Sequence, residues 1–63
     1  MYKFKIMATS MGRKAKILTG DFSLKDVMKL ADQEFKNDTF VVIQEFIEDE
    51  YKLVNLRYNN KWL

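Results

Sequence analysis

The chain contains neither cysteine nor histidine in its 63 residues. This absence excludes disulfide bonds and the commonest structural zinc sites. A chain this short buries only about 60% of the surface that its unfolded form exposes, and small domains usually offset that limit with disulfides, a metal or self-association. We therefore expect one compact domain over residues 1–63, stabilised by close packing or by oligomerisation.

Alternating apolar residues predict two strands in the N-terminal third of the chain. Apolar side chains occupy every second position in residues 2–8, and residues 14–19 alternate again. A loop centred on residues 11–12 would pair Ile6 with Ile17 and place apolar side chains on one face. A register one residue away would set Ile6 against the other face. We therefore expect a hairpin of even length.

A helix is predicted to follow this hairpin. Ser23 is a good N-cap, and Asp26 stands three residues later, as in a capping box. The residues Asn37-Asp38 are expected to end the helix. Six apolar residues at helical spacing form a single stripe for the core: Leu24, Val27, Met28, Leu30, Ala31 and Phe35.

Two further strands are predicted in residues 39–47 and 51–58, which are rich in β-branched and aromatic residues. A turn centred on Asp49-Glu50 would join them. That register would place six residues on one face, under the helix: Val41, Ile43, Ile47, Val54, Leu56 and Tyr58.

The predicted class is α+β, with the order ββαββ and one helix packed on one face of a four-stranded sheet. This order, over residues 2–58, resembles the β-grasp architecture of ubiquitin-like domains and of the immunoglobulin-binding domains of protein G. The resemblance implies that the first and last strands lie parallel at the centre of the sheet. It rests on element order and implies no binding residue. The alternative is a plain antiparallel ββαββ sheet.

The residue types that usually carry catalysis are missing. Without histidine and cysteine, the commonest general base, nucleophile and metal ligands are absent. Gly12 and Gly20 stand alone and form no phosphate-binding loop. The acidic group Glu45, Glu48, Asp49 and Glu50 lacks the spacing of a calcium loop and is more typical of a solvated turn. We expect a non-enzymatic protein with no catalytic residue, cofactor or metal.

The face of the sheet opposite the helix is predicted to be apolar as well. A one-sided antiparallel sheet normally carries polar residues there, and a large exposed apolar patch usually marks an interface. We expect a protein-interaction module that binds a protein partner and forms a homo-oligomer, through this face or through an exposed edge in residues 39–47. The alternative is that the C-terminal tail folds over the face. The expected interface residues are Phe40, Val42, Phe46, Tyr51, Leu53 and Trp62.

A nucleic-acid partner is the second hypothesis. The net charge is only +2, but residues 1–20 carry five basic residues and no acid. Aromatic residues such as Phe46 and Tyr51 would stack on bases, while basic residues of the sheet would contact phosphates. The expected phosphate-binding residues are Lys3, Lys5, Lys14, Lys16 and Arg57.

The composition also carries expectations about location and source. No stretch approaches the ~20 apolar residues of a membrane span, so we expect a cytoplasmic protein without membrane contact. The small size, the fold and a composition rich in lysine, asparagine and phenylalanine are also typical of phage or mobile-element proteins that modulate a host factor.

Overall fold

The computed structural model describes residues 2–11 and 13–63. The α+β class is confirmed, but the described residues form five strands instead of the expected four. The additional strand arises because Asn59 and Asn60, at φ 50° and 67°, turn the chain back onto the preceding strand. The elements are β1 (Phe4–Thr9), β2 (Lys16–Gly20), α1 (Leu24–Glu34), β3 (Phe40–Ile47), β4 (Glu50–Tyr58) and β5 (Lys61–Trp62).

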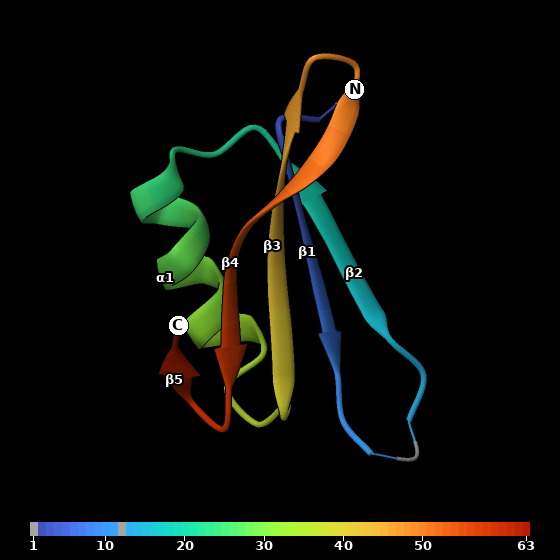
Figure 1. Cartoon of the computed structure of the whole chain (residues 1–63). Coiled ribbons are helices and arrows are strands. Elements are labelled where there is room, and N and C mark those ends of the chain that lie inside the picture. The colour runs from blue at the N-terminus through green and yellow to red at the C-terminus, as the bar shows by residue number, and fades with distance from the viewer. Residues whose placement is uncertain (1, 12) are drawn as a thin grey trace.

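The strand order is β2-β1-β3-β4-β5, and every neighbouring pair is antiparallel (Figure 1). The expected β-grasp arrangement is therefore wrong, because β3, not β4, lies beside β1. The alternative of an antiparallel sheet describes the strand pairing. β3 was expected to be an edge strand, but it lies between β1 and β4. The central position suits the strand whose Val41 and Ile43 are fully buried beneath the helix.

The register of the first hairpin differs by one residue from the prediction. Leu18 lies opposite Ile6 and packs against the core, whereas Ile17 lies opposite Met7 on the other face. This register sets Gly20 opposite Phe4 and brings the Lys16 ammonium group within 3.3 Å of an Asp38 carboxylate oxygen. The predicted even-length loop is wrong, and Gly12 lies outside the described residues.

The second hairpin also differs, through its turn and a bulge. The two turn residues are Glu48 and Asp49, at φ 53° and 66°, and positive values at both positions match the twist of the flanking strands. The register then shifts between Ile43 and Gln44. Such a bulge reverses the faces of the residues beyond it. As a result Arg57 points to the helix side, and Leu56 lies opposite Val42 on the other face, outside the core predicted for it.

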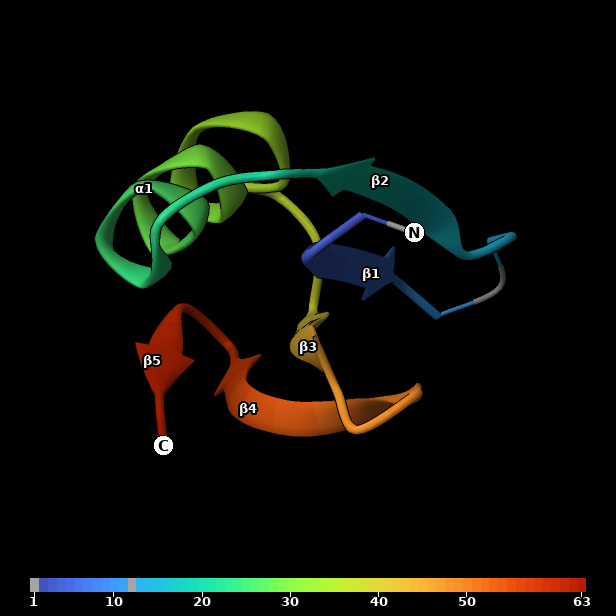
Figure 2. The ribbon, with the colours of Figure 1, turned by 90° about the horizontal axis from the view of Figure 1, so that it is seen from above.

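The sheet curls around α1, which covers its concave side (Figure 2). The predicted N-cap is confirmed: the Ser23 hydroxyl accepts a hydrogen bond from the Asp26 backbone N–H at 3.2 Å. The core consists of side chains from β1, α1 and β3: Phe4, Ile6, Ala8, Val27, Ala31, Phe35, Val41 and Ile43.

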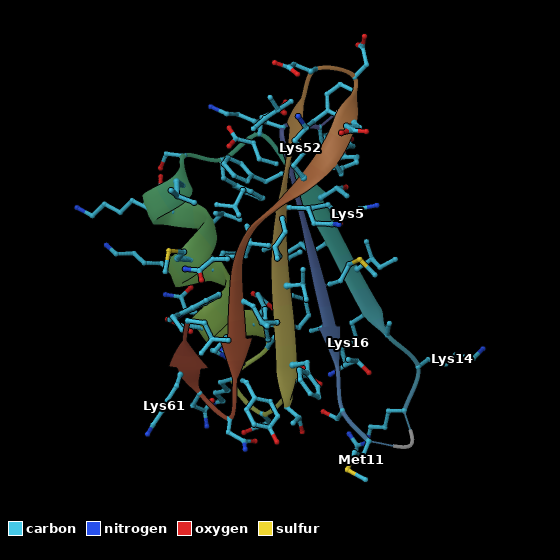
Figure 3. All side chains as sticks on the ribbon, in the orientation of Figure 1. Lys5, Met11, Lys14, Lys16, Lys52 and Lys61 are labelled. Carbon is cyan, nitrogen blue, oxygen red and sulfur yellow. The ribbon has the colours of Figure 1, made fainter. Side chains whose placement is uncertain are left out.

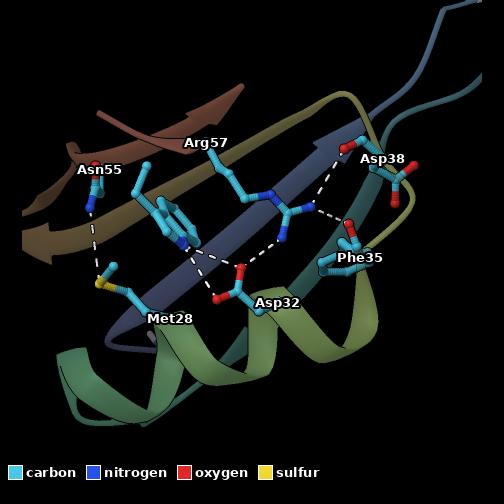
Figure 4. Close-up of polar contacts among 7 residues, drawn as sticks. Met28, Asp32, Phe35, Asp38, Asn55 and Arg57 are labelled. Atoms are coloured by element: carbon cyan, nitrogen blue, oxygen red, sulfur yellow. Dashed lines mark hydrogen bonds and ion pairs between the residues drawn. The ribbon is translucent and has the colours of Figure 1, made fainter. Parts of the chain in front are cut away.

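A buried arginine joins this helix to the sheet (Figure 4). The Arg57 side chain is 2% exposed, and its Nη1 donates to Asp32 Oδ1 at 2.8 Å. Nη2 donates to the carbonyl oxygens of Phe35 and, at 3.5 Å, of Asp38. The last turn of α1 carries no basic residue. Arg57 therefore supplies, from β4, the positive charge that stabilises a helix C-terminus.

The C-terminal strand contacts the same cluster. Trp62 Nε1 donates to Asp32 Oδ1 at 3.2 Å, and the Arg57 guanidinium carbon lies 5.8 Å from the centre of the Trp62 ring. The Leu63 backbone N–H donates to the Leu56 carbonyl at 2.9 Å. The tail is thus held on the helix side of the sheet.

Replacing Arg57 with methionine should lower the free energy of unfolding by roughly 2–4 kcal/mol, because it removes the buried hydrogen bonds to the Phe35 and Asp38 carbonyl groups and the ion pair with Asp32. Urea denaturation followed by circular dichroism measures this loss. Lys61→Met is the matched control; its side chain is exposed, and we expect a change within about 0.5 kcal/mol. Equal effects of the two substitutions would contradict the role given to Arg57.

Candidate protein-interaction surface

The side of the sheet turned away from α1 is apolar across four strands. The cross-strand pairs define which side chains share it, because directly paired residues point to the same side of a sheet. Ile17 and Leu53 are 60% and 63% exposed. We call this surface the outer face. Its residues are Lys5, Met7, Thr9, Ile17, Thr19, Phe40, Val42, Gln44, Phe46, Tyr51, Leu53, Leu56 and Tyr58.

Two aromatic pairs give the outer face a fixed shape. The rings of Phe40 and Tyr58 lie 4.8 Å apart, and those of Phe46 and Tyr51 lie 5.2 Å apart in an edge-on arrangement. The Tyr51 hydroxyl donates to the Tyr2 carbonyl at 2.8 Å, and the Lys5 ammonium group lies 4.5 Å from the centre of the Tyr51 ring. These contacts hold large apolar groups in place before any partner binds.

Five of the six predicted interface residues lie together on the outer face: Phe40, Val42, Phe46, Tyr51 and Leu53. The sixth, Trp62, lies on the helix side, where it is half-buried and bonded to Asp32. The tail therefore does not cover the outer face, contrary to the alternative considered from the sequence.

Ile17, Leu56 and Tyr58 also belong to the outer face, although the sequence pattern predicted them on the helix side. The turn at Glu48-Asp49 sets Phe46 opposite Tyr51 and leaves both on the face predicted for them, so the bulge accounts for Leu56 and Tyr58. This bulge has no signal in the sequence.

The five predicted phosphate-binding residues do not form one surface, and Figure 3 shows Lys5 well apart from Lys14 and Lys16 along the sheet. Arg57 was expected on the outer face, but it is buried on the helix side, because the bulge reverses its direction. Lys16 also lies on the helix side, opposite the buried Ala8. Lys3 lies 3.9 Å from a Glu45 carboxylate oxygen, and Lys14 lies in the loop before β2. Only Lys5 belongs to the outer face.

The buried carboxylate of Asp38, just before β3, contacts the residue that follows β1 and the first residue of β2. Asp38 is 6% exposed; its Oδ1 accepts from the Ser10 hydroxyl at 2.9 Å, and its Oδ2 lies 3.3 Å from Lys16 Nζ. Burial by itself raises the pKa of Asp38. The hydrogen bonds from Ser10 and Lys16, with the positive charges of Lys16 and Arg13, outweigh burial and lower the pKa below its ordinary value.

Residues 2–11 and 13–63 enclose no pocket and contain no group of three or more side chains suited to hold a metal ion. Within the same residues, no helix is long and apolar enough to cross a membrane. Comparisons of the chain with protein-family models, with curated proteins and with solved structures found no match.

Asp38→Asn should destabilise the fold at neutral pH by about 1–3 kcal/mol, because it weakens charge-assisted hydrogen bonds. The lowered pKa means that the carboxylate stabilises the folded state above its unfolded pKa of about 3.9. That contribution disappears as the pH falls through the folded pKa. Urea denaturation at several pH values should therefore show the gap between wild type and variant closing below about pH 4.

Glu34→Gln, on the exposed face of α1, is the control for this experiment. It should leave both the stability and its pH dependence close to those of the wild type. A gap between wild type and Asp38→Asn that stays constant through the acid range would contradict the electrostatic role of Asp38.

Proposed function

We propose that this protein is a non-enzymatic protein-interaction module that self-associates through its outer face. The observation that supports the proposal is the extent of that face: apolar side chains follow one another from Ile17 on β2 to Leu53 on β4. An antiparallel sheet with one solvated side usually alternates apolar and polar residues. Here Met7, Val42 and Leu56 continue the apolar surface where polar residues are expected.

Self-association also suits the size of the chain. A single helix on a 63-residue chain covers only one side of the sheet, and small domains gain stability by covering the remaining apolar surface. Each side chain moved out of water on the outer face contributes about 25 cal/mol for every Å² of apolar surface buried.

The composition of the outer face is typical of the centre of an interface. Its aromatic residues are held by mutual packing, and Tyr and Phe are enriched at binding surfaces, while charged residues are depleted there. Lys5 is its one charged residue among those described, and it rests against Tyr51. A partner that covers the outer face therefore desolvates little charge.

The geometry of the outer face favours a protein partner over a nucleic acid at that face. Phosphate contacts need several basic groups that are free and close together. Lys16 and Arg57 are engaged with Asp38 and Asp32 on the helix side, and only Lys5 accompanies the aromatic residues. The outer face therefore offers aromatic rings on which bases could stack, but it lacks the group of basic side chains that would bind phosphates.

Leu53→Asp should convert the associated protein into a folded monomer, because it places a charge in the most exposed part of the apolar surface. Analytical ultracentrifugation at tens of micromolar should show a dimer or larger species for the wild type and a monomer for the variant. Circular dichroism should show an unchanged fold, since the side chain is 63% exposed.

Leu24→Asp provides the matched control. Leu24 is also exposed, at 46%, but it lies in the first turn of α1, where an acidic residue is favourable. This variant should associate as the wild type does. A wild-type protein that remains monomeric at several hundred micromolar would contradict self-association.

A further inference from the structure

The charges of this protein are divided between the two ends of the sheet. One end holds the β3–β4 turn and the start of β1; the strand pairs place it opposite the end that holds the β1–β2 loop and the β4–β5 turn (Figure 1). The first, which we call the acidic end, has five acids and three lysines: Asp21, Glu45, Glu48, Asp49, Glu50, Lys3, Lys5 and Lys52.

The other end, which we call the basic end, has the opposite sign. It has five basic residues and two acids: Arg13, Lys14, Lys16, Lys36, Lys61, Glu34 and Asp38. Five acids against three lysines give the acidic end a charge of −2, and five basic groups against two acids give the basic end a charge of +3. The long axis of the molecule, 32 Å, separates the two.

The shape of the sheet limits how two outer faces can meet. The sheet curls across its strands, so its outer face is convex in that direction (Figure 2). Two such faces make the longest contact when their strands are nearly aligned, as in aligned sheet packing. Two aligned arrangements exist: like ends together, or opposite ends together.

We infer that two copies pack outer face to outer face as a two-fold dimer with antiparallel strands, the acidic end of each copy beside the basic end of the other. This inference rests on the proposed function and adds the identity and orientation of the partner. With like ends together, −2 would face −2 and +3 would face +3, which disfavours that arrangement. A two-fold contact uses the same patch on both copies, so assembly stops at two.

Exposed charge pairs are individually weak, but the symmetric contact occurs at both ends and therefore counts twice. The apolar outer face supplies the affinity, and the charged ends select the orientation. Attraction between opposite ends is screened by salt, whereas repulsion between like ends would be relieved by it. The two arrangements therefore respond to salt in opposite directions.

Sedimentation equilibrium at low and high sodium chloride is the first test. Raising the salt from about 0.02 M to 0.5 M should weaken the dimer roughly threefold to tenfold. Asp49→Asn combined with Glu50→Gln should weaken it similarly at low salt; asparagine keeps the positive φ of the turn. The control, Lys29→Gln in the middle of α1 on the helix side, should leave the dimer unchanged. A dimer tightened by salt or by the neutralised acidic end would overturn the inference.

A distance measurement tests the orientation directly, and the chain's lack of cysteine allows a single introduced label. Spin labels on Glu50→Cys protein, and separately on Lys14→Cys protein, should give distances between the two copies comparable with the 32 Å long axis. A mixture of the two labelled proteins should add a much shorter distance. Short distances between identical sites would refute the antiparallel arrangement while leaving self-association intact. Absence of any dimer would refute both.

Discussion

The buried guanidinium of Arg57 is the contact on which the arrangement of helix and sheet depends. It is 2% exposed, and it joins Asp32, the carbonyl end of α1 and, through Asp32, the Trp62 indole. A buried charge without partners is strongly unfavourable, so the helix, β4 and β5 must stay close enough to satisfy it. In a chain without disulfides or a zinc site, this polar cluster helps fix the relative position of elements that hydrophobic contact alone would leave less well defined.

The position of Arg57 and the apolar character of the outer face have one common cause. The bulge in the β3–β4 pairing turns Arg57 inward, and the same shift turns Leu56 and Tyr58 outward. The outer face thereby gains two large side chains that stack beside Val42 and Phe40. The bulge that buries Arg57 against α1 therefore also enlarges the outer face, through which we propose that the protein associates.

Much of the local structure could be predicted from the residues. The Ser23 cap, the helical stripe of Val27, Ala31 and Phe35, and the existence of the two hairpins follow from short-range patterns that the structure repeats. Five of the six predicted interface residues lie on the outer face for the same reason, since alternation along a strand assigns neighbours to opposite sides. The strand β5 was missed although Asn59-Asn60 is a recognisable turn pair.

The sequence by itself determined the α+β class, the helix with its cap, and a surplus of apolar residues beyond what one helix can cover, because these depend on composition and on contacts between near neighbours. Only the tertiary structure decided the strand order, both hairpin registers and the burial of Arg57. These depend on polar contacts between groups far apart in the sequence. The ion pair of Lys16 with Asp38 accompanies the register of β2, and the contacts of Arg57 with Asp32 and the end of α1 position the helix on the sheet. A shift of one residue in register exchanges the two faces of a strand, so such long-range contacts decide whether a side chain is core or surface.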